Sequence, residues 1–240
     1  MHALGCHAAD GSSRRHAFGR RIVVACGLAL LAGGTVHGAP AAQAPQAGGG
    51  PAAALMPAGV ARGVITPDTP MWMAGYGSRD HHAEGKVHDL MVKAVAIVLV
   101  TLDLVGIDRD TSRRITSRLE ERHGITRDRV AINTSHTHCG PIVGDNLPAM
   151  FSLSKEDLEL GAAYVKLLEE RVVECVGAAL ADRRPARVSW GQGTCSVAVN
   201  RRENKEPEVP AIRAAGRPLR GPFDHDVPVL AIHDESGQIR

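Results

Sequence analysis

Two histidines that stand two residues apart, His136 and His138, have types and a spacing that could do chemistry. Imidazole nitrogens bind metal ions and exchange protons near neutral pH. The pair by itself says little, because 12 histidines among 240 residues give about 0.6 His-x-His pairs by chance. It is either a metal or acid/base site or two ordinary polar residues at the end of a strand.

The residues around the pair indicate where it lies. Residues 129–135 alternate between apolar and polar or small side chains, which predicts a strand, and Gly140-Pro141 ends the run. If the strand continues to His138, both imidazoles leave its carboxyl end on the same side. Ligands of open α/β sheets bind at that edge. The spacing therefore permits a site.

Two helices are expected to support this strand. Asp110 is placed to cap the first helix, and Gly124 is placed to end it. The second helix has the clearest pattern in the chain. Ser154 and Asp157 form a capping box, and apolar residues then recur at spacings of three and four to about Ala181.

Runs of apolar and β-branched residues predict the strands. Residues 59–76 read as a strand followed by a loop rich in proline and glycine. The apolar run at 93–105 is long for one strand, since typical strands have about 5–6 residues. Later strands are expected at 187–191, 194–199 and 227–233, with a hairpin turn at 234–237. The expected fold class is α/β, a mixed sheet flanked by helices and incomplete at the carboxyl end, because the last turn leads into an unfinished strand.

The first 58 residues do not belong to this sheet. Residues 1–44 predict a secretory signal peptide, because a basic region precedes a short apolar run at 22–32 and small residues that suit cleavage. That run is too short to span a bilayer. We expect export to the periplasm or out of the cell, by either the Sec or the twin-arginine route. Residues 45–58 read as a flexible Ala/Pro/Gly leader, and 59–240 as the folded domain.

Composition limits the partners and the redox chemistry. A net charge of +2 and 3% aromatic residues argue against nucleic acid as a partner. Once a signal peptide is removed, Cys139, Cys175 and Cys195 remain, an odd number that gives no self-contained disulfide framework. A Cys175–Cys195 bridge stays open, and Cys139 is either a metal ligand or a small buried residue.

Four segments in order resemble a known family. They are residues 63–67 (GVITP), 73–76 (MAGY), 133–141 (NTSHTHCGP) and 199–201 (VNR). Over residues 59–234 the chain resembles the amino-terminal catalytic domain of the neutral/alkaline non-lysosomal ceramidases. The His-Thr-His-x-Gly-Pro segment is the most specific part of the resemblance, and the ordered set is stronger than any one piece.

The resemblance implies a hydrolase that uses one Zn²⁺ to cleave the amide bond of ceramide, giving sphingosine and a fatty acid. The implied partner is a small lipid or amide substrate at a membrane surface. His136 matches a zinc ligand, and His138 matches a residue near the metal that contacts the substrate or the oxyanion. Arg201 matches an arginine that lines the site. Gly75 lies on the loop that approaches the site, and Tyr76 either shapes the substrate entrance or packs in the core.

This chemistry suits the residue types. An amide is a poor electrophile with a poor leaving group, so its hydrolysis needs an activated water and positive charge at the oxyanion. Zinc lowers the pKa of bound water to about 7 and polarises the carbonyl. Hydrogen bonds from His138 and Arg201 would stabilise the oxyanion, where losing one donor typically costs on the order of 100-fold in rate.

The chain departs from the family pattern in two places. The family has a turn that contains glycine where this chain runs through 93–105, so two strands are expected to fuse or their hairpin to be lost. The other zinc ligands, a second histidine, a glutamate and a tyrosine, match positions beyond Arg240, as does a serine-containing segment. Since a zinc site needs three or four protein ligands, His136 alone cannot hold the metal.

Three functions are therefore weighed. The first is a zinc amide hydrolase of neutral ceramidase type, present as a partial domain. The second is a related exported zinc hydrolase with a different amide or ester substrate, because a fold does not fix a substrate. The third is a non-catalytic remnant.

His81, His82 and His88 are expected to be loop residues outside the site. Asp103 either belongs to a turn or orients a histidine through its carboxylate.

Overall fold

The computed structural model of the chain describes residues 55–96, 98–146 and 148–240. The predicted signal peptide and most of the predicted leader lie outside these residues. The chain divides into two compact units, Pro57–Pro185 and Ala186–Arg240, the second together with residues 55–56. None of the helices in the described part of the chain has the length and apolar character needed to cross a bilayer.

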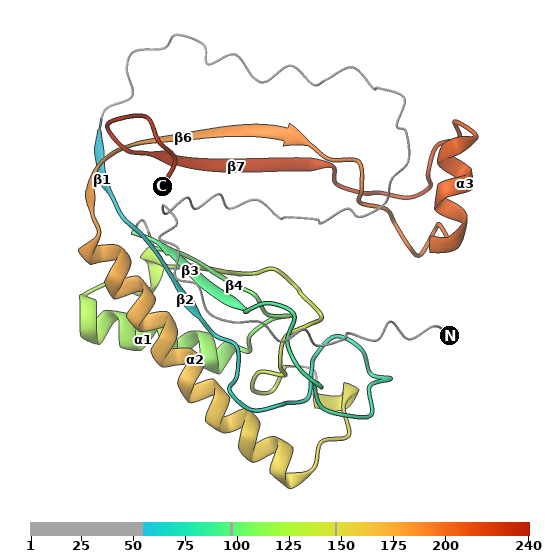
Figure 1. Cartoon of the computed structure of the whole chain (residues 1–240), viewed down its shortest axis with the longest axis horizontal. Coiled ribbons are helices and arrows are strands. Elements are labelled where there is room, and N and C mark those ends of the chain that lie inside the picture. Colours follow the sequence, from blue (N-terminus) through green and yellow to red (C-terminus); the bar gives the residue numbers. More distant parts are fainter. Residues whose placement is uncertain (1–54, 97, 147) are drawn as a thin grey trace, which may run out of the picture. The chain divides into compact units, whose positions relative to one another are not determined.

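The first unit contains a four-stranded sheet in the order β2-β3-β4-β5 (Figure 1). Its strands are β2 (Val60–Val64), β3 (Met91–Val95), β4 (Leu99–Leu102) and β5 (Ala131–Thr134). The pairs β2–β3 and β3–β4 are antiparallel, and β4–β5 is parallel. The predicted α/β class with a mixed sheet is thereby confirmed, as is a strand within 129–135.

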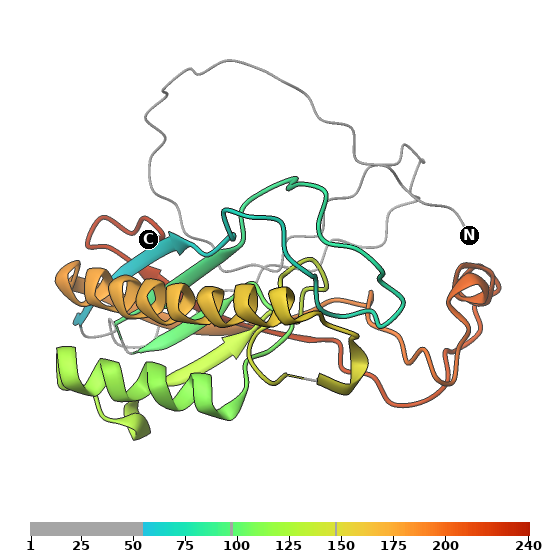
Figure 2. The ribbon, with the colours of Figure 1, turned by 90° about the horizontal axis from the view of Figure 1, so that it is seen from below.

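Helices α1 (Arg109–His123) and α2 (Lys155–Ala181) lie side by side on one face of this sheet (Figure 2). Alternate strand residues point to the helices, so Val92 and Ala94 of β3 and Val100 and Leu102 of β4 are buried. The helices meet them with Ile115 and Leu119 of α1 and Leu168, Val172, Val173 and Val176 of α2. Each large apolar side chain buried this way contributes about 1.5–3 kcal/mol.

The predicted caps are confirmed for α2 and corrected for α1. The Ser154 hydroxyl accepts a hydrogen bond from the Asp157 backbone N–H, and the Asp157 carboxylate accepts one from the Ser154 backbone N–H. The α1 cap is Asp108 and not Asp110, because the Asp108 carboxylate accepts the Thr111 backbone N–H at 2.8 Å. Gly124 ends α1 in the left-handed region, as expected.

The expectation that residues 93–105 fuse into one strand or lose their hairpin is wrong. Strands β3 and β4 form a tight antiparallel hairpin, with Val95 opposite Leu99. Its turn places Val98 at φ 59°, a conformation in which a β-branched residue is strained. The Val98 N–H donates to Val95 O at 2.7 Å, and the Val98 side chain is buried in the core. These contacts and the strand pairing offset the strain, so the turn forms without glycine at position 98.

The second unit is built on a long antiparallel ribbon of β6 (Arg184–Thr194) and β7 (Asp226–His233). Strand β1 (Met56–Ala58) completes a three-stranded sheet in the order β1-β6-β7. Helix α3 (Val209–Ala214) lies in the connection between β6 and β7. Short 3₁₀ turns occur at η1 (Arg127–Arg129), η2 (Pro148–Met150) and η3 (Glu206–Glu208).

Three of the four late predictions hold. The strand expected at 227–233 is β7, and the hairpin turn at 234–237 is confirmed by the hydrogen bond from Gly237 N to Asp234 O. The strand expected at 187–191 lies within β6, which runs unbroken through 184–194, whereas the separate strand expected at 194–199 is wrong, because 195–199 is not a strand. Continuous pairing with β7 as far as Asp226 carries β6 through Gly191 and Gly193.

Candidate functional site

The loops that follow β4 and β5 meet at one edge of the first sheet. Because the two strands are parallel, their carboxyl ends lie side by side, with Leu102 opposite Thr134. His136 follows β5 by two residues, and its Nδ1 atom lies 2.9 Å from Val105 O in the loop after β4. A carbonyl oxygen can only accept, so Nδ1 carries the proton, and Nε2 of the neutral ring keeps its lone pair.

The strand does not continue to His138, so the argument from strand alternation is wrong. Strand β5 ends at Thr134, and His136 stands at φ 55°. The turn nevertheless brings the two imidazoles together, with ring centroids 5.1 Å apart and planes at 65°. A non-glycine residue in the left-handed backbone region, such as His136, costs on the order of 1–3 kcal/mol, and such strain clusters at functional sites.

The backbone of Gly75 lies close against the His138 ring. Its φ is 104°, which side chains of L residues rarely adopt, and a β-carbon placed there would lie 2.3 Å from His138 Cγ. Position 75 therefore needs glycine for its backbone conformation and for its contact with the imidazole. Gly75, predicted to lie on the loop that approaches the site, is thus in contact with His138.

Tyr76 and Arg79 complete the surroundings of His138. The Tyr76 ring meets the His138 ring edge-on at 4.6 Å, and the Arg79 guanidinium stands 5.1 Å from the centre of the Tyr76 ring. Arg79 Nη2 donates to His138 O at 2.7 Å, and Nη1 donates to Ala74 O. Sequence reasoning missed Arg79. Its place three residues after Tyr76 in a polar loop is the only hint in the sequence.

Backbone hydrogen bonds fix the two segments that carry these residues. Ala74 N donates to Gly140 O at 2.9 Å, and Ile142 N donates to Trp72 O at 3.1 Å. A β-bridge joins Met73 and Pro141 between these bonds. The segments 72–75 and 138–142 therefore run antiparallel, and the histidines lie at one end of this short ladder.

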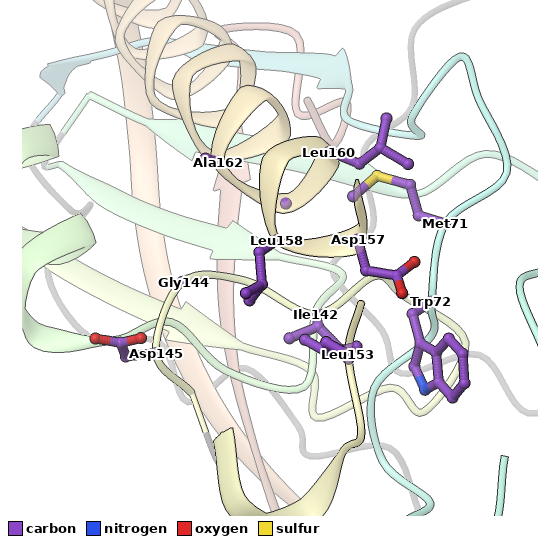
Figure 3. A pocket seen from close by; sticks show the side chains of 11 residues that line it. Met71, Trp72, Ile142, Gly144, Asp145, Leu153, Asp157, Leu158, Leu160 and Ala162 are labelled. Atoms are coloured by element: carbon purple, nitrogen blue, oxygen red, sulfur yellow. The ribbon is translucent and has the colours of Figure 1, made fainter. Parts of the chain in front are cut away.

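A pocket of about 190 Å³ lies at the other end, against the first turns of α2 (Figure 3). Ile142, Leu153 and Leu158 gather at its centre, and the Asp157 carboxylate points toward Trp72. Asp157 Oδ1 lies 2.5 Å from His82 Nε2. The Ser154 hydroxyl, and more weakly His82, hold the pKa of Asp157 below its usual value of 3.8, against the opposing effect of burial. The rim therefore carries a carboxylate at neutral pH.

Arg201, Asp103 and Cys139 are the other candidate residues. Arg201 belongs to the second unit, where its exposed side chain is 3.4 Å from Glu206 in a charged loop. The Asp103 carboxylate accepts the Met91 N–H at 3.0 Å, so it serves the β3–β4 pair. Cys139 is exposed, and the described cysteines, Cys175 and Cys195 among them, are free thiols.

Solved structures share this arrangement of strands and helices. One, described as neutral ceramidase from Pseudomonas aeruginosa, has a TM-score of 0.54 and 19% identity over 78% of this chain and 30% of its own. Another, described as ceramidase complexed with C2, has a TM-score of 0.55 with the same identity and coverage. The fold is ceramidase-like. This chain spans about 30% of the length of those proteins. No family model matches the chain, and no curated protein matches its sequence.

The donor chemistry of His136 fits a zinc ligand on this ceramidase-like fold. Metal-binding histidines usually donate their second ring N–H to a carbonyl or carboxylate, and Val105 O receives that bond here. No group of three or more His, Cys, Asp or Glu that could hold a metal occurs among residues 55–96, 98–146 and 148–240. The described part of the chain thus offers one ligand of suitable chemistry and not a full set.

Proposed function

We propose that residues 59–240 are part of the catalytic domain of an exported, zinc-dependent amide hydrolase of neutral ceramidase type. The reaction would be cleavage of N-acylsphingosine to sphingosine and a fatty acid. The observation that carries the proposal is the setting of His136. Its Nδ1–H is held by Val105 O, its ring lies 5.1 Å from that of His138, and its backbone is strained. The ceramidase-like fold, shared with a solved neutral ceramidase, supports the choice of this type of hydrolase.

Each residue then has a role that its position allows. His136 would hold zinc through Nε2, with the other ligands supplied from outside the described residues. Zinc, when bound, supplies a water of lowered pKa and a Lewis acid for the amide carbonyl. His138 would donate a hydrogen bond to the oxyanion. Gly75 and Tyr76 would line the approach of the substrate.

The strain at His136 supports a role beyond packing. A histidine held at φ 55° by a hydrogen bond to a carbonyl has a fixed ring direction. Fixed direction is what a metal ligand needs, because a site that is about 1 Å too loose binds and catalyses poorly. If position 136 had only a structural role, glycine or asparagine would adopt this backbone conformation at a lower cost.

The pocket near the site favours a small apolar substrate group. An apolar cavity of about 150 Å³ accommodates benzene, so a pocket of about 190 Å³ takes a short apolar group and not a whole long acyl chain. This observation gives weight to a second candidate, an exported zinc hydrolase on the same fold that cleaves a smaller amide or ester. The substrate class is therefore part of the test.

The test uses the protein expressed to the natural stop codon of its gene, with zinc content and fatty-acid release as readouts. We expect His136→Ala to lose bound zinc and hydrolysis together. His138→Ala should keep zinc and lose on the order of 100-fold in kcat. His88→Ala, which changes an exposed loop histidine, is the matched control and should keep both. Zinc content in His136→Ala equal to that in His88→Ala would rule out the proposed ligand.

A substrate panel separates the two candidates. The same preparations are offered N-acylsphingosine in mixed micelles, a short-chain N-acyl amide and a short-chain ester. Release from N-acylsphingosine above that from the short amide supports the ceramidase activity. Release from the short amide or the ester alone supports the second candidate.

A further inference from the structure

We propose that Arg79 is the positioning residue that sets the orientation of the His138 imidazole by clamping the Gly75–Tyr76 turn onto it. The proposal rests on the proposed function for its catalytic meaning, since it assigns His138 an orientation that matters to the reaction. Its structural content stands on the contacts of Arg79 alone.

The clamp consists of two hydrogen bonds from one guanidinium. Arg79 Nη1 donates to Ala74 O and Nη2 donates to His138 O, 59 positions away in the chain. The planar, rigid fork of arginine can serve two acceptors at fixed angles, which an ammonium cannot do in the same way. The guanidinium thus joins the two segments where Gly75 lies against the imidazole.

The position of the clamp extends the backbone ladder. The bond from Ala74 N to Gly140 O holds the segments on one side of Gly75. Arg79 bridges Ala74 O and His138 O, the carbonyls that come next along the two segments. The Gly75 backbone and the His138 ring are then in close contact, as the 2.3 Å approach of a hypothetical β-carbon to His138 Cγ shows.

The same guanidinium also orders Tyr76. It stands 5.1 Å from the centre of the Tyr76 ring, within the range of a cation–π contact. The Tyr76 ring in turn packs edge-on against His138 at 4.6 Å, although half of Tyr76 is exposed to solvent (51%). An exposed aromatic ring would otherwise exchange between rotamers, so Arg79 fixes both groups that border the imidazole.

The test measures the orientation of His138 directly, by NMR of the metal-free full chain labelled in its histidines. In the unsubstituted protein the Tyr76 ring current should displace the ring resonances of His138. Tyr76→Leu calibrates that displacement, and His138→Asn assigns the resonances. We expect Arg79→Gln and Arg79→Lys both to lose the displacement, while His136 resonances change little because Val105 O still holds that ring.

Arg127→Gln is the matched control. Arg127 also donates to a backbone carbonyl, Val130 O at 2.8 Å, in the same unit but in the 3₁₀ turn η1. Its loss should leave the His138 resonances in place. Unchanged His138 resonances in Arg79→Gln would overturn the proposal, and so would a displacement that Arg79→Lys preserves, because charge alone would then suffice. If circular dichroism shows that both Arg79 variants are unfolded, the proposal is overturned as well, and Arg79 has a structural role.

Kinetics adds the catalytic part. If the protein hydrolyses an amide, Arg79→Gln should lower kcat by about 10- to 100-fold and leave zinc content unchanged, because His136 is not touched. If no zinc binding or hydrolysis is found, the proposed function fails, but the NMR result still decides whether Arg79 positions His138. Equal kcat in Arg79→Gln and the unsubstituted protein would overturn the catalytic part.

Discussion

Substitution of Gly75 by alanine should destabilise the first unit by considerably more than an ordinary glycine substitution. Two costs add at this position. A side chain in the left-handed region costs about 1–2 kcal/mol, and Gly75 stands at φ 104°. The new β-carbon would also overlap the His138 ring, 2.3 Å from Cγ. Relief of an overlap by movement of the neighbour typically costs about 1–3 kcal/mol. The sum is about 2–5 kcal/mol.

Gly124→Ala separates the two costs. Gly124 stands at φ 66° in the same unit, and a β-carbon there meets nothing within 4 Å. That control should cost only the backbone term, about 1–2 kcal/mol. The excess of Gly75→Ala over Gly124→Ala therefore measures the contact between position 75 and the imidazole.

Urea unfolding followed by tryptophan fluorescence measures both variants. The chain has two tryptophans, and Trp190 is 82% exposed. A Trp190→Phe background leaves Trp72, beside the site, as the reporter of the first unit. With a urea slope of about 1–3 kcal/mol per molar, Gly75→Ala should lower the midpoint by about 1–2 M. A free energy of unfolding for Gly75→Ala within about 0.5 kcal/mol of the Gly124→Ala value would refute the contact.

Three further outcomes follow from charges and burial in the first unit. Glu169 is buried between two arginines of α1. Glu169→Gln should lower the free energy of unfolding, measured with urea, by about 1–2 kcal/mol. The control Glu174→Gln, at an exposed ion pair, should lower it by less than about 0.5 kcal/mol. Asp157 has a lowered pKa, mainly through the Ser154 hydroxyl, so it stabilises the fold above its ordinary pKa of 3.8. That stability is lost as the pH falls through the folded value, so the difference from Asp157→Asn should be constant above about pH 5 and shrink as the pH falls below 3.8. Burial raises the pKa of the Cys175 thiol to about 11, so peptide mapping after alkylation at neutral pH should find Cys139 modified and Cys175 protected until the chain is unfolded.

Local patterns were sufficient for the elements whose signals are short-range. The α2 capping box joins residues three apart, and the turn at 234–237 depends on its own four residues. The predicted α1 cap was two positions too late, because Asp108 and Asp110 both stand at the start of the helical pattern. The choice between them rests on which carboxylate reaches the Thr111 N–H.

The β3–β4 hairpin was not predictable from local signals. Its turn has Val98 where a left-handed residue is needed, and sequence rules place glycine or asparagine there. The pairing of two apolar strands and the burial of the Val98 side chain are tertiary terms. They outweigh a local strain of about 1–2 kcal/mol, which a window of a few residues cannot reveal.

The sequence by itself determined which residues are candidates for the site, because imidazoles near a strand end and a glycine before an aromatic ring are visible as residue types. It also determined the α/β class through periodicity. The tertiary structure alone decided that a left-handed turn, and not strand alternation, brings His136 and His138 together. It alone joined Arg79 to His138 across 59 positions. Such contacts depend on how distant segments pack, and no spacing along the chain encodes a distance in space.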